Sequence, residues 1–432
     1  MTDVRERPDF KRIDLDLTTP AFFAEGDPLA AYARLREEDP VHWTKGRLSR
    51  GFWSITRYKE AQYVYANDNK SFSVQMWGNV LPANPDFEDP ANDEALRLTR
   101  EGANLSAMDG DPHTRLRKAF SEMFGPSYIK TLEGLVRRFS VEILNGVLEK
   151  GECDFATDVA ARLPLMMIAH IMDIDRSMWD DLYLWNNMFA SPDDPEFAIG
   201  SPIETATFAF RKINEVCVRL AHERRANPVG NDLLSVVART TLDGELLSDE
   251  RLGYNGLMFF AAGHETTRNT LCAGLTALLG DPAEFQRLRA LRHDDEALKV
   301  AVEEFVRWTT PLNHIMRSAT VDMTLGGTEI KAGDLVVVWN LSANRDPRAF
   351  QNPDRFDCQR RPNQHLGFAL GKHFCLGAHL ARLEMRVMLG YLLEHMQDIE
   401  LVGNVERSVS NLFPGIKHMP VRFRPAAKIV TI

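Results

Sequence analysis

The thiol of Cys375 is the side chain whose setting most clearly indicates chemistry. It lies in the stretch 368–377, which reads FALGKHFCLG and comes directly before a strongly helical pattern at 378–396. The glycines let the backbone pass close to a flat ligand, and the start of the helix favours an anionic sulfur through its free N–H groups. A lone cysteine is usually inert in a core. Here the glycines, the basic His373 and the helix start coincide, which indicates a thiolate held for a metal.

A second group of reactive side chains lies inside an apolar run. Glu265, Thr266 and Thr267 interrupt the segment 252–279, which otherwise has the composition of a buried helix. A buried acid is costly unless it is hydrogen-bonded or faces water, whereas a threonine can bond to a preceding carbonyl of its own helix. That alternative explains Thr267 but not Glu265. Gly263, two residues earlier, would let a ligand approach or the helix open locally.

The third motif is a pair of opposite charges, Glu304 and Arg307. They lie three residues apart in the helical run 296–308 and therefore share a face. Taken alone, such a pair is usually a surface ion pair worth a few tenths of a kcal/mol. A second arginine, Arg355, follows in the Pro-Asp-Arg-Phe stretch at 353–356. Only the pair together with this stretch indicates more than an ordinary surface ion pair.

Together these motifs resemble those of the cytochrome P450 haem-thiolate monooxygenases, whose haem-binding signature reads Phe-Gly-x-Gly-x-His-x-Cys-x-Gly. The stretch 368–377 matches it with one departure, because Ala369 stands at the first glycine. The turn before the cysteine must therefore be one that tolerates a β-carbon. The Ala-Gly-x-Glu-Thr run at 262–266 is similar to the family's distal helix over the haem. The resemblance implies the cytochrome P450 fold, mainly α with a minor β region, in a single haem-thiolate monooxygenase domain over residues 1–432.

The resemblance also implies a role for each of these side chains. Cys375 would be the axial ligand that pushes electron density onto the iron of haem b (iron protoporphyrin IX) and favours O–O cleavage. Glu265 and Thr266 would be the catalytic acid and alcohol that relay protons to the bound dioxygen. A buried structural triad, which anchors the loop behind the haem, would consist of Glu304, Arg307 and Arg355.

Further family positions would bind the haem edge and the substrate. Arginine binds carboxylates such as the haem propionates in a forked geometry. His113 and Arg117 could merely share a solvated helix face, but the resemblance assigns them, with Arg317 and His373, to the propionates. The haem contacts that it implies are His113, Arg117, Ala262, Arg317, Phe368, His373, Cys375 and Gly377. The pocket-lining candidates are Trp77, Met258, Phe259, Ala262, Ile315 and Leu412.

Hydrophobic patterns predict the elements that must position these residues. Helices are expected at 28–38, 113–124, 128–150, 159–172, 176–189, 208–226, 252–279 and 377–396, and strands at 41–44, 51–56, 315–325 and 335–339. The long irregular stretch 73–108 is of a length that is usually functional or disordered. By resemblance it covers the substrate pocket, 252–279 is the distal oxygen-activating helix, and 365–396 contains the haem-thiolate loop and proximal helix.

Composition narrows the class of protein. The 432 residues are 44% hydrophobic, and no linker or repeat divides them, which favours one domain. Five scattered cysteines form no disulfide framework and suit a reducing cytosol. The net charge of −10 argues against nucleic acid. The charged N-terminus lacks a signal-peptide core and a membrane anchor, so a cytoplasmic protein of the bacterial type is expected.

The electron donors are expected to be separate proteins, because no flavin or iron–sulfur domain follows the motifs. Electrons would pass from NAD(P)H through a ferredoxin reductase and a ferredoxin. Four basic residues on the thiolate side could form a docking patch for an acidic ferredoxin, although a solvated face fits them equally well. They are Arg115, Lys118, Lys372 and Arg382.

The sequence therefore predicts a monooxygenase that inserts one atom of O2 into a lipophilic small molecule, typically by hydroxylation. The substrate would be a terpenoid, steroid-like or aromatic hydrocarbon, since the residues after Glu265 and the stretch 415–420 resemble those of bacterial members that act on steroid side chains and terpenoids. Two alternatives stay open. One is a peroxide-driven peroxygenase, for which the relay of Glu265 and Thr266 would be unnecessary, and the other is a non-catalytic haem-binding sensor.

Overall fold

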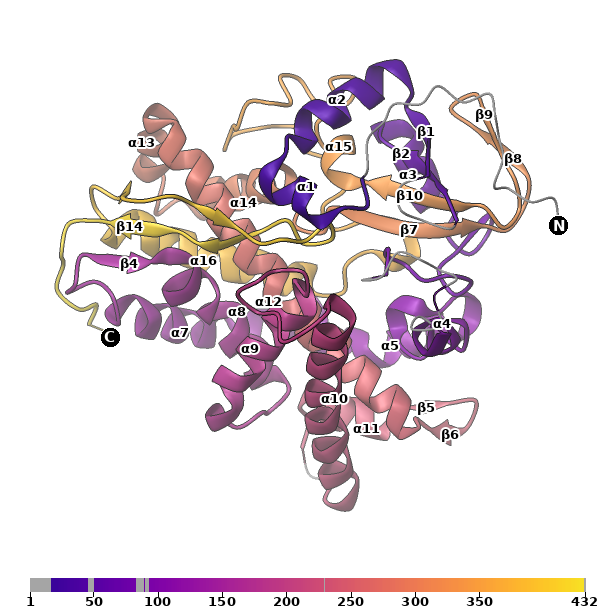
Figure 1. The fold of residues 1–432 in the computed structure, drawn as a ribbon. Helices are drawn as coiled ribbons and strands as arrows, with labels where there is room; N and C mark the ends of the chain where they lie inside the picture. The colour runs from indigo at the N-terminus through magenta and orange to yellow at the C-terminus, as the bar shows by residue number, and fades with distance from the viewer. Residues whose placement is uncertain (1–16, 46–49, 83–88, 90–92, 229, 431–432) are drawn as a thin grey trace.

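The computed structural model describes residues 17–45, 50–82, 89, 93–228 and 230–430. Helices make up most of this chain, and they gather around α12 (Asp249–Gly280), which crosses the molecule (Figure 1). The other helices are α1 (Pro20–Glu25), α2 (Pro28–Glu38), α3 (Tyr58–Ala66), α4 (Asp93–Arg100), α5 (Gly110–Ser121), α6 (Pro126–Thr131), α7 (Glu133–Asn145), α8 (Arg162–Ile171), α9 (Trp179–Ala190), α10 (Pro202–Ala226), α11 (Leu233–Arg239), α13 (Pro282–Ala290), α14 (Asp295–Thr309), α15 (Asn340–Ala343) and α16 (Ala378–His395).

The central helix α12 is surrounded by other elements, which explains its long apolar sequence. It contacts α8, α9, α10, α14 and α16 along its 32 residues. Its start is fixed by Ser248, whose side chain accepts a hydrogen bond from the Arg251 backbone N–H. At Gly274 the helix approaches α14 so closely that a β-carbon would lie 1.9 Å from a ring carbon of Phe305. Small residues therefore let α12 and α14 pack tightly.

The minor β region is a five-stranded sheet beside the helices. Its strand order is β1 (Val41–Thr44), β2 (Phe52–Ile55), β10 (Leu335–Trp339), β7 (His314–Ala319) and β3 (Phe72–Ser73). β10 pairs parallel with β2 and antiparallel with β7. A three-stranded sheet consists of β11 (Glu400–Leu401), β14 (Pro420–Arg422) and β4 (Glu152–Asp154), and three two-stranded pairs are β5 (Thr241–Leu242) with β6 (Glu245–Leu246), β8 (Met323–Leu325) with β9 (Thr328–Ile330), and β12 (Glu406–Arg407) with β13 (Ile416–His418).

Both faces of the five-stranded sheet are buried, so β10 is a continuous apolar run. Leu335, Val337 and Trp339 pack in one core with side chains of α1 and α2. Val336 and Val338 pack in another core with side chains of α3. Because Arg317 and Ile315 of β7 lie opposite Val336 and Val338, the sheet fixes where these two side chains project.

The mainly α fold predicted from the sequence is confirmed, and most predicted helices lie within a few residues of the observed ones. The predicted helix 128–150 is two helices, α6 and α7, and the predicted strand 315–325 is divided between β7 and β8. Helix α10 starts at Pro202 and not at residue 208. Ser201 and Glu204 form a reciprocal capping box there, since each side chain bonds to the other's backbone N–H.

The stretch 73–108 is less irregular than predicted. It contains α4 and a short 3-10 helix, η2 (Leu105–Ala107), while residues 83–88 and 90–92 of it lie outside the described residues. Asp109 ties the start of this stretch down, because its carboxylate accepts hydrogen bonds from the Ser73 hydroxyl at 2.5 Å and the Val74 backbone at 3.2 Å.

None of the described helices combines the length and the apolar composition that a membrane-spanning segment needs.

A buried cluster of charges around Glu304 joins α14 to the loop that precedes α16. The guanidinium of Arg307 donates to both carboxylate oxygens of Glu304, at 2.7 and 2.8 Å, and to the carbonyls of Asn344 and Pro353, both at 2.9 Å. Both side chains are fully buried. The segments of this loop that reach Glu304 or Arg307 are therefore held by charge-assisted hydrogen bonds.

The third arginine of this cluster is Arg360 and not the predicted Arg355. Arg360 donates from Nε to Glu304 at 3.0 Å, whereas the side chain of Arg355 is exposed. Arg355 contributes only its backbone carbonyl, which accepts from Arg360 at 2.8 Å and from Arg307 at 3.3 Å. The loop turns between the two arginines, and that turn sends Arg355 outward and Arg360 back toward the carboxylate.

Replacing Glu304 with alanine is expected to lower the free energy of unfolding by about 3–5 kcal/mol, because Arg307 and Arg360 would stay buried without their counter-charge. Equilibrium urea unfolding followed by circular dichroism measures the change. Lys299→Ala on the same helix is the control. Its ion pairs with Asp295 and Glu296 are exposed, so the loss should be under about 0.5 kcal/mol. Equal losses in the two variants would contradict a structural role for Glu304.

Candidate active site

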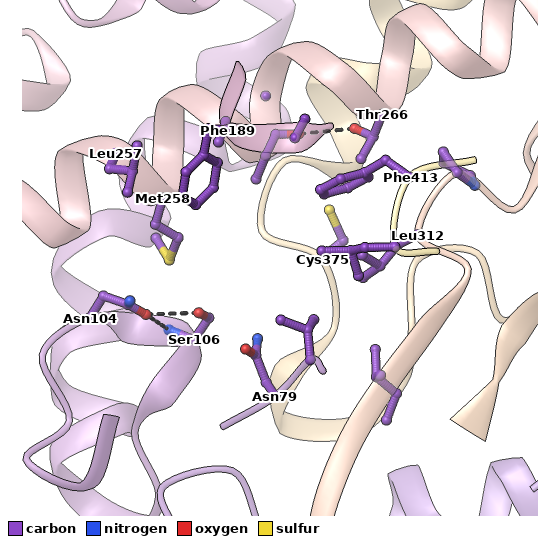
Figure 2. A pocket seen from close by; sticks show the side chains of 18 of the residues that line it. Asn79, Asn104, Ser106, Phe189, Leu257, Met258, Thr266, Leu312, Cys375 and Phe413 are labelled. Carbon is purple, nitrogen blue, oxygen red and sulfur yellow. Dashed lines mark hydrogen bonds between the residues drawn. The ribbon is translucent and has the colours of Figure 1, made fainter. Parts of the chain in front are cut away.

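A cavity of about 1050 Å³ lies between α12, residues within 77–82 and 96–106, β7 and the loop that carries Cys375. Most of its lining is apolar. Figure 2 shows Cys375 near Phe413 and Leu312, with Thr266 of α12 across from them. The cavity therefore brings the predicted thiol and the predicted alcohol to one space, although they are far apart in sequence.

The loop before Cys375 is a turn that the backbone holds rigidly. Gly371 has a φ of +70°, and a β-carbon there would lie 2.7 Å from the carbonyl oxygen of Tyr65. The Cys375 N–H donates to the carbonyl of Phe368 at 2.9 Å, which closes the turn behind the sulfur.

Ala369 corrects one expectation about this turn. Its φ is +58°, in the left-handed region, so the turn does not favour a β-carbon. An L-residue in that conformation costs roughly 1–2 kcal/mol. The bond from the Ala369 N–H to the Leu366 carbonyl, at 2.9 Å, is one of the contacts that hold the residue there.

The surroundings of the Cys375 thiol act on its ionisation in opposite directions. Burial raises the pKa of Cys375, while the Gly377 N–H and the guanidinium groups of Arg117 and Arg382 lower it. A metal cation on the sulfur would replace the thiol proton outright. Within the described part of the chain, no three His, Cys, Asp or Glu side chains gather into a metal site.

The four residues predicted to hold propionates, His113, Arg117, Arg317 and His373, converge on one wall of the cavity. The rings of His113 and His373 lie with their centroids 4.3 Å apart. Both nitrogens of His113 and the Nε2 of His373 are buried and have no hydrogen-bond partner among the described residues. Unpartnered buried polar atoms of this kind are costly. They fit a bound group that brings hydrogen-bonding oxygens to this wall.

Electrostatics at this wall also fit an anionic group. Burial and the positive charge of Arg117 lower the pKa of His113 to about 4, and burial and Arg317 lower that of His373 to about 2. The two rings are therefore neutral beside two guanidinium groups. A macrocycle with carboxylates would supply negative charge and hydrogen-bonding oxygens to this wall, so the residues present fit haem.

Arg117 and Arg317 differ in how much of their guanidinium is available. Arg117 donates to the carbonyl of Phe374 at 2.6 Å, which also ties α5 to the cysteine loop. Arg317 forms a forked pair with the buried Asp68, at 2.6 and 3.1 Å, and donates to the carbonyl of Met316 at 2.9 Å. Asp68 is a partner that the sequence motifs did not indicate.

On α12 the predicted catalytic pair is divided between two faces. Ala262, Gly263 and Thr266 line the cavity, whereas Glu265 does not. The Thr266 hydroxyl donates to the carbonyl of Ala262 at 2.9 Å, and the helix continues unbroken past Gly263. Adjacent residues of a helix project about 100° apart, which accounts for the division.

Glu265 points into a buried polar network behind α12. Its Oε1 accepts from the Arg268 guanidinium and from the Asn269 amide, the latter at 3.1 Å. Arg268 also donates to the Asn187 side chain of α9 at 2.7 Å. Burial raises the pKa of Glu265, and the charge of Arg268 lowers it. The Oε2 atom has no hydrogen-bond partner among the described residues, so the network leaves one acceptor free.

Sequence reasoning missed Arg268 as the partner of the acid and Asn187 as the further partner of Arg268. Arg268 follows Glu265 by three residues, and that spacing could have indicated the pair. Asn187 lies on another helix, and nothing in the sequence indicates its contact. His264 is packed in the core, where its ring contacts Tyr183 edge-on and its Nδ1 lies 2.8 Å from the Asn186 amide.

The cavity is also lined by every predicted substrate contact and by two further predicted haem contacts. These residues are Trp77, Met258, Phe259, Ala262, Ile315 and Leu412, together with Phe368 and Gly377. Phe259 lies mostly in the core, since it packs against Phe120 and Phe124. Lining residues that the sequence analysis missed include Asn79, Asn104, Ser106, Phe189, Leu312 and Phe413.

The four basic residues proposed as a docking patch are not equivalent. Arg115 forms ion pairs with Asp111 at 2.9 Å and Asp243 at 2.8 Å. Arg382 pairs with Glu303 at 2.7 Å and lies over the ring of Phe368. Lys118 and Lys372 are exposed. The positive charge that a partner could meet is therefore concentrated at the two lysines.

Comparisons with known proteins agree on one family. The sequence model of the family described as cytochrome P450 matches residues 80–400. The chain is 32% identical over 427 residues to the steroid C26-monooxygenase of Mycolicibacterium smegmatis, covering 96% of this chain and 95% of that protein. It is 31% identical to the linalool 8-monooxygenase of Pseudomonas putida, covering 97% and 100%. The solved structure of Mycobacterium marinum cytochrome P450 CYP268A2 in complex with pseudoionone superposes with a TM-score of 0.85 at 31% identity, covering 97% and 100%.

Replacing Cys375 with serine is expected to abolish the thiolate-type absorption band of the reduced, carbon monoxide-bound protein, because the soft sulfur ligand is lost. Absorbance spectroscopy of the reconstituted variant measures the band. Cys358→Ser is the control and should keep the band, because Cys358 lies outside the cavity lining and burial raises the pKa of its thiol. A thiolate-type band in the Cys375 variant would assign the ligand to another cysteine.

Thr266→Ala and Glu265→Gln are expected to fail differently, since only Thr266 faces the cavity. Loss of the Thr266 hydroxyl should leave NAD(P)H consumption running while hydrogen peroxide replaces most of the product. Loss of the Glu265 acid should slow turnover by about 100-fold, the lower end of the range for a lost proton-transfer group. Parallel assays of NAD(P)H, peroxide and product separate the two outcomes. Unchanged coupling in Thr266→Ala would remove that residue from the mechanism.

Proposed function

The chain belongs to the cytochrome P450 family, and we propose that it inserts one atom of O2 into a terpenoid, steroid-like or aromatic hydrocarbon, typically by hydroxylation. The chain is a haem-thiolate monooxygenase, and we propose haem b as the form of its haem. When bound, a haem with a thiolate ligand supplies the activation of dioxygen and the cleavage of its O–O bond. The observation that carries the proposal is the largely apolar cavity that reaches both Cys375 and Thr266.

We propose that Cys375 binds the iron and that the wall of His113, Arg117 and His373 binds the propionates. The unpartnered ring nitrogens and the neutral state of both histidines support this assignment. Arg317 would act chiefly through its positive charge, because Asp68 already holds its forked face. Ala262, Phe368 and Gly377, which line the cavity near these residues, would contact the faces of the macrocycle.

In the proposed mechanism Glu265 supplies protons and Thr266 forms a hydrogen bond inside the cavity. Burial raises the pKa of Glu265 and thereby favours a proton on this carboxyl, which suits a donor. Thr266, whose hydroxyl faces the cavity, would donate a hydrogen bond to the dioxygen substrate there. Its hydroxyl proton is engaged by the Ala262 carbonyl, so it must exchange that partner when it donates to a ligand. A proton from Glu265 must pass around the helix backbone to reach the cavity, through side chains or water.

The substrate class is supported by the lining and by the relatives. Large parts of the wall are apolar, and burial of apolar area at about 25 cal/mol per Å² can hold a hydrocarbon without an ion pair. Among similar proteins, one is named for oxygenating a steroid, one for oxygenating linalool, and one was solved with pseudoionone. All three are lipophilic molecules of the size that a pocket of this kind accepts.

We propose that electrons come from NAD(P)H through a ferredoxin reductase and a ferredoxin. The exposed Lys118 on α5 and Lys372, in the short 3-10 helix η6 (Gly371–His373) before Cys375, would meet the acidic ferredoxin. Arg115 and Arg382 are already paired within the chain and would contribute less. Steering by such charges weakens as salt is added.

We also propose that residues 1–432 act as a single catalytic domain. The lining of the cavity includes residues from Thr18 to Phe413, so its walls come from most of the described chain. Within it, 73–108 would cover the substrate, 252–279 would form the oxygen-activating wall, and 365–396 would hold the thiolate and the helix behind it.

Reconstitution with NADPH, ferredoxin reductase and ferredoxin should give products that are one oxygen atom heavier than the terpenoid or steroid-like substrates. Mass spectrometry of incubations under 18O2 measures the transfer. Catalase in the assay removes hydrogen peroxide, so product that persists supports the monooxygenase over a peroxygenase. Ala262→Phe should weaken substrate binding, measured from the shift of the haem Soret band, by at least about tenfold because the ring fills space beside Thr266. A panel in which only polar acids shifted the band would overturn the proposed substrate class.

A further inference from the structure

Three polar side chains, Asn79, Asn104 and Ser106, line the cavity. Figure 2 shows their polar ends turned toward the open space of the cavity, below Met258 and on the other side from Thr266. None of the three was predicted from the sequence as a site residue. Together we call them the polar subsite.

Asn104 is held so that its amide nitrogen is left to a ligand. Its Oδ1 accepts from the backbone N–H groups of Ser106 and Ala107, at 2.9 and 3.2 Å, and from the Ser106 hydroxyl at 2.7 Å. These donors fix which end of the carboxamide is the oxygen. The Nδ2 atom, on the opposite end, has no hydrogen bond to the chain as far as it is described.

Ser106 and Asn79 complete the set. The Ser106 hydroxyl gives its proton to Asn104, so its lone pairs are left to accept a hydrogen bond. The backbone of Asn79 is fixed, because its carbonyl accepts from the Met316 N–H at 2.6 Å. Its side-chain carboxamide, in contrast, has no partner in the described residues. The subsite thus offers amide donors and one hydroxyl acceptor, all neutral.

Two other polar residues of the lining, Asn340 and Ser410, already have hydrogen-bond partners. Asn340 accepts from Tyr65 at 2.7 Å and donates to the carbonyl of Leu312 at 3.2 Å. Ser410 donates to the carbonyl of Ala190 and accepts from the Phe413 N–H, both at 3.1 Å. Away from the wall of His113 and His373, the atoms of Asn79, Asn104 and Ser106 that lack partners keep hydrogen-bonding capacity for a ligand in the cavity.

We propose that the polar subsite binds a neutral carbonyl or hydroxyl oxygen of the substrate, so that the preferred substrates are terpenoid or steroid-like ketones and alcohols and not plain hydrocarbons. This inference rests on the proposed function and narrows it. A site built to hydrogen-bond an oxygen disfavours the analogue without it, because its partly buried polar groups are then left unpaired. Holding the oxygen at this wall also directs the opposite, apolar end of the substrate toward Thr266 and Cys375.

The test compares three ligands that share one carbon skeleton: menthone, menthol and p-menthane. Each is titrated into the haem-loaded wild type, Asn79→Leu and Asn104→Asp, and the dissociation constant is read from the Soret shift. For each protein, the dissociation constants of two ligands are expressed as a ratio. The ligands differ in solubility, but this difference cancels when the same ratio is compared between the wild type and a variant. The carbon monoxide spectrum of each variant confirms that it is folded and loaded.

In Asn79→Leu the ratio of the menthone to the p-menthane dissociation constant is expected to rise by about 3- to 10-fold, the value of one net hydrogen bond. Asn104→Asp keeps the oxygen that caps η2 but replaces the Nδ2 donor with an acceptor. This variant should bind menthone more weakly by a similar factor. It should still bind menthol, because the hydroxyl of menthol can donate to the new acceptor. Thr207→Val changes a polar residue that lines the cavity from α10 and is the matched control.

Ratios that do not change in either asparagine variant, or that change equally in Thr207→Val, would overturn the polar subsite and show that these groups bind water only. Binding of the terpenoids would then still support the proposed function. If none of the three ligands nor any larger terpenoid or steroid shifted the Soret band of the wild type, the proposed substrate class would fail, and this inference with it.

Discussion

The buried pairing of Glu304 with Arg307 and Arg360 is the interaction on which the position of the thiol depends. Charges taken out of water are tolerated only when each is neutralised and hydrogen-bonded, and here one carboxylate, two guanidinium groups and several carbonyls satisfy one another. The loop between α15 and Cys375 has little regular structure of its own, so these bonds define its path. The rigid turn that follows can then place the sulfur at the cavity and not in the core.

Local motifs predicted the chemistry of this chain better than they predicted its geometry. The glycine-rich turn, the cysteine and the helix behind it are adjacent in sequence, so their arrangement could be read directly. His113, Arg117, Arg317 and His373 were assigned to one task from family positions, and the structure does bring them to one wall. Periodicity located most helices, because each has an apolar face that packs in a hydrophobic core. Helix ends were less predictable where a cap such as that of Ser201 and Glu204 sets the start.

What could not be predicted depends on contacts between distant segments or on the backbone. Arg355 and Arg360 are both plausible partners for Glu304, and only the course of the turn selects one. Glu265 and Thr266 are neighbours in sequence, yet the helix turns one toward Arg268 and the other toward the cavity. The left-handed conformation of Ala369 contradicts the ordinary preference of its residue type. Asn79 and Asn104 resemble any loop asparagine until the fold shows which of their atoms lack partners.

The cavity affects how much intact protein accumulates in a cell. An opening of about 1050 Å³ among the packed helices, with unpartnered histidine nitrogens on one wall, removes packing and leaves buried polar atoms unsatisfied in the haem-free chain. A cofactor that binds the folded chain alone adds stability by mass action, about 1.4 kcal/mol for each tenfold rise of its free concentration above the dissociation constant. The abundance of intact protein should therefore follow the haem supply of the cell. Chains synthesised faster than haem is delivered would be the ones that proteases remove first.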